Sequence, residues 1–198
     1  MQLLTREDFI KKYANSIEKI CKGTGVFPQT LFAIAIVESQ AKAQDGKYYV
    51  GLSPLAKDYN NYFGIKATAN WKGKKVKLNT PNDFEKKSVF RVYNNFVDSA
   101  KDFIKFLKEN PRYKKAGVFN AKTYPEQIIS IARAGYSESE TYSKIITQVA
   151  DKINKYIESY IKPIQKKIIK GLPIILLLGG LSIYLYNKNQ KQKLLNYE

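Results

Sequence analysis

The chain has 198 residues, a net charge of +17 from 34 Lys and Arg against 17 Asp and Glu, and 44% hydrophobic residues. This length and composition predict one folded domain with an appendage, and they argue against a disordered chain. The absence of histidine and the presence of a single cysteine, Cys21, exclude Ser-His-Asp and Cys-His catalysis, His-ligated zinc and an internal disulfide. Any hydrolytic chemistry would depend on carboxylates, tyrosine, lysine or serine, and we expect no metal and no cofactor.

The excess of positive charge indicates a polyanionic partner, such as a nucleic acid, an anionic membrane or an anionic cell-wall polymer. The sequence shows no helix-turn-helix, zinc finger or RNA-binding aromatic signature. We therefore expect no specific nucleic-acid partner, although charge alone does not choose among the polyanions.

The first predicted helix runs from about Arg6 to Cys21. Thr5, followed three residues later by Asp8, resembles a capping box, and apolar residues follow at helical spacing. Glycines at 23 and 25 end this helix. Cys21 falls in its last turn, where we expect it to pack in the core. The residues before this helix lack the apolar segment of a signal peptide.

The second predicted helix begins near Pro28, contains an unusually apolar run and ends in a carboxylate, Glu38. Leu31, Ile34, Ala35 and Glu38 fall on one face, which predicts that Glu38 continues the core-facing stripe. Poor solvation there would raise its pKa and keep the acid protonated near neutral pH, as a glycosidase acid requires. The alternative is a helix-end glutamate whose head group turns to solvent.

The middle of the chain changes from helical to strand-like patterns. Residues 40–50 are polar and predict a loop, and residues 53–58 predict a short helix. Residues 71–80 and 88–93 contain alternating, β-branched and aromatic positions, and a turn-rich connection separates them. We therefore predict a β-hairpin lobe over about residues 68–93.

Helical patterns then resume. One apolar stripe spans Phe96 to Leu107 and is followed by Pro111, and a further helix runs from about 125 to 134 and stops at Gly135. A long helix is predicted from about 140 to 161. The residues predicted on one face of it are Tyr142, Ile145, Val149, Ile153 and Tyr156.

Residues 168–186 predict a C-terminal transmembrane helix. This stretch of 19 residues has one charge, Lys170, and a helix of that length spans about 30 Å, the thickness of a bilayer core. Lysines flank both ends, in a linker at 163–167 and a basic tail at 187–198. The alternative is a buried hydrophobic helix, which would not usually carry lysine clusters at both ends.

Four short motifs occur in an order that resembles one known family. They are Ala35–Ser39, Asn61–Lys66, Phe90–Tyr93 with Asn110–Tyr113, and Ala134–Tyr136 with Tyr142. Over about residues 5–160 the chain resembles the glucosaminidase domain of glycoside hydrolase family 73, which includes flagellar muramidase-like enzymes and autolysins. The resemblance implies a mainly α (α+β), lysozyme-like domain over residues 1–162, with a cleft between a helical lobe and the β-hairpin lobe.

The resemblance also implies catalytic roles. Glu38 matches the family's general acid, and the family often has a second acid in the hairpin after a threonine. Here Asp83 stands where the family usually has glutamate, and Glu85 is the alternative. Two mechanisms stay open: inversion, with the carboxyl groups roughly 6.5–9.5 Å apart, or attack by the acetamido group of the substrate itself.

Four further residues are candidates for sugar binding: Asn61, Phe63, Tyr136 and Tyr142. Each has a structural alternative, since Asn61 could cap a turn, Phe63 could be a core aromatic, and the tyrosines could pack on helical faces. Gln40 and Ala41 depart from the family pattern after Ser39, which affects details of the sugar subsites.

The sequence thus predicts a peptidoglycan hydrolase, an endo-β-N-acetylglucosaminidase that cleaves β-1,4 bonds. Its expected partners are peptidoglycan strands and, through a single-pass C-terminal helix, a lipid membrane. An anchor without a signal-peptide pattern favours the membrane of a bacteriophage particle, with other virion proteins as partners, and next the host inner membrane. The alternative is a non-catalytic, membrane-anchored virion protein that is structural or binds glycan, which the substitutions at Asp83 and Gln40 favour.

Overall fold

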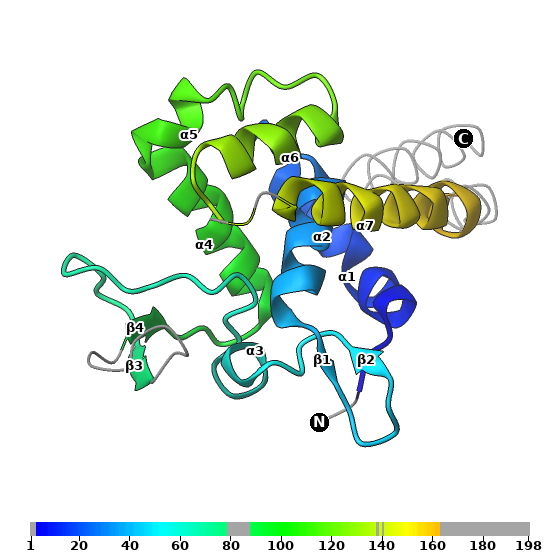
Figure 1. Ribbon diagram of the computed structural model, residues 1–198, viewed down its shortest axis with the longest axis horizontal. Helices are drawn as coiled ribbons and strands as arrows, with labels where there is room; N and C mark the ends of the chain where they lie inside the picture. Colours follow the sequence, from blue (N-terminus) through cyan, green and yellow to red (C-terminus); the bar gives the residue numbers. More distant parts are fainter. Residues whose placement is uncertain (1–2, 79–87, 138, 140, 163–198) are drawn as a thin grey trace, which may run out of the picture. The chain divides into compact units, whose positions relative to one another are not determined.

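The computed structural model describes residues 3–78, 88–137, 139 and 141–162, and this part of the chain is mainly helical with two small hairpins (Figure 1). The elements in chain order are α1 (Arg6–Cys21), α2 (Pro28–Ser39), β1 (Ala41–Lys42), β2 (Tyr48–Tyr49), α3 (Pro54–Tyr59), β3 (Lys75–Leu78), β4 (Ser88–Arg91), α4 (Phe96–Glu109), α5 (Pro111–Lys115), α6 (Tyr124–Arg133), α7 (Tyr142–Tyr156) and the π-helix η1 (Ile157–Ile161). The chain divides into two units, Met1–Asn154 and Lys155–Glu198, and the fold and site described below lie in the first.

The central element of the first unit is α2, which packs against α1 and α6. Every side chain from Leu31 to Ile36 is buried, so α2 is enclosed on all faces rather than amphipathic. Pro28 occupies its first turn, where the missing N–H costs nothing. Leu31, Ile34 and Ala35 are buried as the predicted core stripe requires, but burial extends to the other faces of the helix, and Glu38 itself is exposed where the helix leaves the core.

An aromatic cluster joins α1, α2 and α4 beside this central helix. The Phe9 and Phe96 rings lie 4.6 Å apart, and Phe32 approaches both. Phe63 continues the cluster by stacking on Phe103 at 4.3 Å, with the two planes nearly parallel. Aromatic pairs of this kind contribute beyond the apolar area that they bury. The cluster fixes the segment around Phe63 to the helical core.

The predicted ends of α1 are confirmed, including its capping residue. The Thr5 hydroxyl accepts a hydrogen bond from the Asp8 N–H at 3.1 Å. Cys21 is buried as expected, and burial raises the pKa of its thiol to about 12. The predicted face of α7 is partly wrong, because Ile146 is fully buried whereas Ile145 is 46% exposed. The helical period of 3.6 residues allows either Ile145 or Ile146 to face the core, and the packing of α7 buries Ile146.

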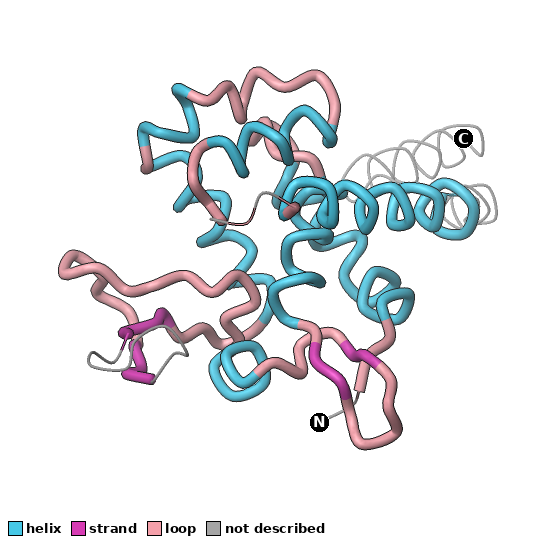
Figure 2. The backbone as a smooth tube through the Cα atoms, in the orientation of Figure 1, coloured by secondary structure: helices cyan, strands magenta, loops and turns pink. Residues whose placement is uncertain are grey.

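The described residues contain two small antiparallel hairpins, β1 with β2 and β3 with β4 (Figure 2), and the sequence predicted only the second. The loop predicted over residues 40–50 contains a small antiparallel hairpin, in which Ala41 pairs with Tyr49. The predicted hairpin lobe is confirmed as β3 paired with β4, in a register that joins Lys75 to Arg91 and Leu78 to Ser88.

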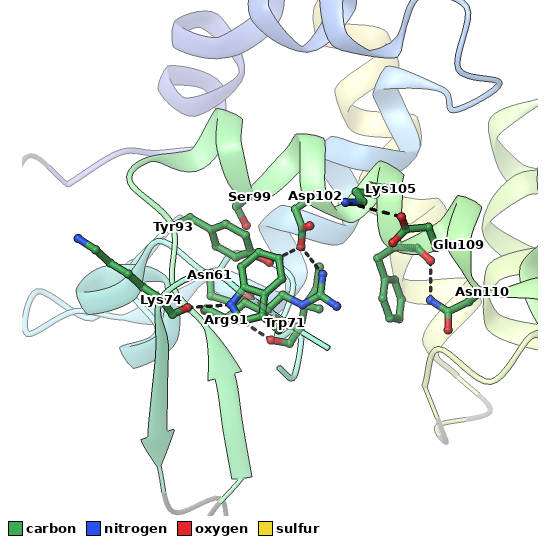
Figure 3. Close-up of polar contacts among 12 residues, drawn as sticks. Asn61, Trp71, Lys74, Arg91, Tyr93, Ser99, Asp102, Lys105, Glu109 and Asn110 are labelled. Carbon is green, nitrogen blue, oxygen red and sulfur yellow. Dashed lines mark hydrogen bonds and ion pairs between the residues drawn. The ribbon is translucent and has the colours of Figure 1, made fainter. Parts of the chain in front are cut away.

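A buried charge network attaches β4 to α4 (Figure 3). Arg91 Nη1 lies 2.7 Å from Asp102 Oδ2, with both side chains 11% exposed, and the Tyr93 hydroxyl donates to the same oxygen at 2.6 Å. The Arg91 guanidinium also stacks over the Trp71 ring at 4.4 Å. Because Asp102 accepts from both the Arg91 guanidinium and the Tyr93 hydroxyl, the network holds the hairpin lobe in one position against α4.

Among the residues that the structure describes, no helix is both long and apolar enough to span a lipid bilayer. The predicted linker, span and tail at 163–167, 168–186 and 187–198 lie outside those residues.

Candidate active site

Glu38, at the end of α2, opens into a pocket of about 440 Å³. The segment 63–66 forms one wall, and side chains from α4, α5 and the loop after α6 complete it. The charged and aromatic side chains that line the pocket are Glu38, Phe63, Lys66, Phe106, Arg112 and Tyr136. A pocket with one carboxylate, two cations and aromatic walls can hold a polar ring and deliver a proton to it.

The position of Glu38 follows from the way α2 ends at the buried Ser39. The Ser39 hydroxyl accepts a hydrogen bond from the Gly51 N–H at 3.1 Å, and its carbonyl accepts one from the Ser53 N–H at 2.8 Å. Gly51 has φ +76°, and an added Cβ would lie 2.7 Å from the Tyr62 hydroxyl, so this turn requires glycine. The loop after α2 therefore fixes the helix end that carries Glu38.

The segment 63–66 is held between β4 and the loop after α6. The Arg91 N–H donates to the Ile65 carbonyl at 3.1 Å, and Lys66 pairs with Phe90 as an isolated bridge. From the other side, the Tyr136 hydroxyl donates to the Phe63 carbonyl at 2.8 Å. The β-hairpin lobe and the loop after α6, which carries Tyr136, are thereby joined to the same wall of the pocket.

Tyr142, the first residue of α7, donates a hydrogen bond from its hydroxyl to Glu38 Oε1 at 3.0 Å. Tyr142 is 7% exposed, and burial strongly raises the pKa of its hydroxyl, so it stays protonated. The Tyr136 ring lies 5.9 Å from the Tyr142 ring. Because Oε1 is occupied by the tyrosine donor, Oε2 is the oxygen that can carry the acid proton of Glu38.

Burial raises the pKa of Glu38 above its ordinary value of 4.5, and the hydrogen bond from Tyr142 opposes the rise. The side chain is solvent-exposed, but it is exposed into the pocket, where the surrounding walls limit its hydration. Its place at the C-terminal end of a helix with no basic residue in the last turn also disfavours the anion. The pKa rise expected from the sequence is therefore confirmed.

Replacing Tyr142 by Phe should move the pH dependence of catalysis. The Tyr142 hydrogen bond favours the ionised form of Glu38, so its loss should raise the Glu38 pKa further. With Glu38 in the general-acid role that the family resemblance implies, it works while protonated, so the alkaline limb of the kcat/KM profile should shift to higher pH. Tyr124→Phe is the matched control, since it removes a 2.7 Å tyrosine–carboxylate bond to Asp151. A limb that stays in place or moves to lower pH would contradict this assignment.

Of the other candidate site residues, the structure brings three close to Glu38 and does not describe two. Phe63, Tyr136 and Tyr142 gather around Glu38, whereas Asp83 and Glu85 lie between β3 and β4, outside the described residues. In the described ranges, no group of three or more Cys, Asp or Glu side chains gathers in a way that could hold a metal ion.

Asn61 is 1% exposed, and its side chain is used by the turn that precedes the pocket wall. Its amide donates to the carbonyls of Ile65 and Arg91 at 3.0 and 2.9 Å, and its oxygen accepts from the Ile65 N–H at 3.1 Å. Of the two roles expected for Asn61, the geometry favours holding the turn.

Asn61→Ala should therefore lower the free energy of unfolding by about 2–3 kcal/mol, because it removes three buried hydrogen bonds to the backbone and leaves the Ile65 N–H without its acceptor. Denaturant unfolding measures this loss, with Asn95→Ala at the exposed N-cap of α4 as a control costing about 1 kcal/mol. Unchanged stability together with lost glycan binding would instead assign Asn61 to the sugar.

Two cations in the pocket were not predicted as site residues, although both lie in motifs that the sequence singles out. Lys66 closes the segment 61–66, and Arg112 lies in Asn110–Tyr113. Lysine and arginine side chains usually lie at the protein surface, and no local sequence pattern distinguishes one that lines a cleft from one that is simply solvated.

Comparison with known proteins places this geometry in a family. A family model described as mannosyl-glycoprotein endo-beta-N-acetylglucosaminidase matches residues 14–160. The chain is 35% identical over 158 residues to the peptidoglycan hydrolase FlgJ of Vibrio parahaemolyticus, covering 74% of this chain and 47% of that protein. It is 30% identical over 159 residues to a probable N-acetylmuramidase of Lactococcus lactis, covering 75% and 34%. The chain thus spans about half, or less, of the length of these relatives.

The solved structures agree with the sequence relatives. The glycoside hydrolase domain of Salmonella typhimurium FlgJ superposes with a TM-score of 0.61 at 25% identity, covering 84% of this chain and 99% of that domain. The catalytic domain of the Listeria monocytogenes autolysin Auto gives a TM-score of 0.57 at 25% identity, covering 79% and 90%. The expected mainly helical, lysozyme-like fold is confirmed, and the chain belongs to the glucosaminidase family.

Proposed function

We propose that this chain is a peptidoglycan hydrolase, an endo-β-N-acetylglucosaminidase with Glu38 as its general acid. The observation that carries the proposal is the raised pKa of a carboxyl group that opens into a walled pocket and is oriented by Tyr142. Membership of the glucosaminidase family and likeness to proteins named peptidoglycan hydrolase FlgJ support the substrate.

In the proposed reaction, protonated Glu38 gives its proton to the glycosidic oxygen as the bond from that oxygen to the anomeric carbon breaks. Water supplies the hydroxyl that ends on the anomeric carbon. Either a hairpin carboxylate, Asp83 or Glu85, accepts the remaining proton of that water, and proton exchange with solvent restores both groups, or the acetamido oxygen of the substrate bonds to the anomeric carbon first, and water then displaces it and gives its proton back to Glu38. Tyr142 stabilises the Glu38 carboxylate that forms when the proton leaves.

The test is release of soluble fragments from dye-labelled bacterial walls by the full chain, across several wall types. Release that depends on Glu38 would support the proposal. A folded chain that binds walls and releases nothing would overturn it in favour of the non-catalytic, glycan-binding alternative.

We also propose that residues 168–186 anchor the protein in a lipid membrane. Their apolar composition and flanking lysines support this. Location in a bacteriophage particle or a host inner membrane stays a prediction. Retention of the full chain by lipid vesicles after high-salt washing, and its loss when Leu176 and Leu177 become Lys, tests the anchor.

A further inference from the structure

Arg112 belongs to the wall of the Glu38 pocket and is not part of the proton-transfer machinery described above. It is the second residue of α5, a short helix that starts at Pro111, directly after α4. Its side chain is exposed and lines the same pocket as Glu38. Among the described residues, no ion pair joins the Arg112 guanidinium to the Glu38 carboxyl.

The guanidinium is held in place by its neighbour in the sequence. Arg112 Nη2 donates to the Tyr113 hydroxyl at 2.8 Å, and the guanidinium carbon lies 4.8 Å from the centre of the Tyr113 ring. Tyr113 is fully buried, so it provides a fixed support. Gly135 is also close to the guanidinium: it has φ +78°, and an added Cβ would lie 3.6 Å from Arg112 Nη1. Arg112 is therefore positioned before any ligand binds.

The charge of Arg112 is left without a counter-ion by the described part of the chain. Of those residues, Tyr113 alone accepts a hydrogen bond from the guanidinium, which has five N–H donors, and no described carboxylate lies within ion-pair distance. Arg91 shows the contrast, since it is buried against Asp102. Arg112 thus presents a planar fork of donors to the pocket.

We propose that Arg112 binds a carboxylate of the substrate, namely one carried by the peptide chains attached to the glycan. This inference rests on the proposed function and deepens it, because it makes the pocket selective for anionic, peptide-bearing strands over neutral N-acetylglucosamine polymers. A guanidinium matches a carboxylate with two parallel hydrogen bonds. Lys66, in the same pocket, offers a point charge and not such a fork.

The experiment compares two substrates that differ in charge alone. Soluble peptide-bearing glycan oligomers are acetylated on their amines, and half of the sample is then amidated on its carboxyl groups. For the full-length protein, we expect Arg112→Gln to lower the ratio of kcat/KM for the carboxylate form over the amidated form by about tenfold. Arg112→Lys should lower it less, since charge is kept and the fork is lost. Lys114→Gln, on the same helix but outside the pocket wall, should leave the ratio as it is.

Tyr113→Phe separates positioning from charge. It keeps the buried ring and removes the hydroxyl that accepts from Arg112, so the same ratio should fall, by less than in Arg112→Gln. A structural role for Arg112 would lower activity on both substrates equally and leave the ratio unchanged, and that result would overturn the inference.

Binding measured in a Glu38→Gln background keeps this test independent of the proposed function. The ratio of Kd values for the same two oligomers should change in the same direction on Arg112→Gln. If wild type cleaves neither oligomer, the hydrolase proposal fails while the Kd ratio still decides the role of Arg112. Cleavage of both forms with no effect of Arg112 on either ratio would reject the inference alone.

Discussion

Glu38→Gln should lower kcat for wall hydrolysis by about 10³-fold while the protein stays folded. The amide keeps the size of the side chain and an oxygen that can accept from Tyr142, but it has no acid proton to give. General acid catalysis typically contributes 10²–10⁴-fold, which sets the expected loss. Initial rates of fragment release from labelled walls measure it. Glu18→Gln, at an exposed position of α1, is the control and should keep full activity.

The same substitution should stabilise the protein at neutral pH. The folded-state pKa of Glu38 is raised, so between the ordinary value of 4.5 and that raised value the folded state binds more protons than the unfolded state. Stability is then lost as pH rises through this window, and Gln avoids the loss. Denaturant unfolding at pH 7 should show Glu38→Gln as the more stable protein, and the difference should vanish near pH 3. A variant that is inactive because it is unfolded would contradict both expectations.

Asp102→Ala should cost about 3–5 kcal/mol of unfolding free energy. It removes the partner of a buried arginine, Arg91, and the acceptor of the Tyr93 hydroxyl, so a charge and a donor are left buried without compensation (Figure 3). Denaturant unfolding followed by circular dichroism measures the loss. Glu109→Gln is the matched control on the same helix, because it breaks an exposed pair with Lys105 at 3.6 Å and should cost less than about 0.5 kcal/mol.

A double variant distinguishes loss of the pair from loss of packing. Arg91→Met combined with Asp102→Ala removes the uncompensated charge, so it should be more stable than Asp102→Ala alone. Equal or additive losses in the single and double variants would show that the Arg91–Asp102 contact does not act as a buried charge pair.

Local signals predicted the helices well where the chain carries its own boundary residues. Thr5 with Asp8 marks the start of α1, which has both predicted ends, and Pro28 marks the start of α2, which ends at Ser39, one residue after Glu38. The β3–β4 hairpin was predicted because alternating and β-branched residues have a period that helices lack. The short hairpin of β1 and β2 was not, since two-residue strands in a polar stretch carry no such period.

The parts that the sequence could not predict depend on contacts between distant segments. The apolar run before Glu38 predicts that its side chain is buried. In the structure the side chain is exposed into a pocket, and the walls contributed by α5 and the loop after α6 limit its hydration. The hydrogen bond between Tyr142 and Glu38 joins residues 104 positions apart, and no local sequence pattern predicts it. The choice of Ile146 over Ile145 as a core residue is likewise made by packing.

The chemical identity of the new reducing end is the measurement that tests the account most directly. Purified walls are digested with the full-length protein, the fragments are reduced with borohydride, and the terminal sugar is identified by mass spectrometry. We expect N-acetylglucosaminitol at the new ends, with none formed by Glu38→Gln. N-acetylmuramitol at those ends would contradict the account, because the same fold would then be cleaving the bond on the other side of each disaccharide.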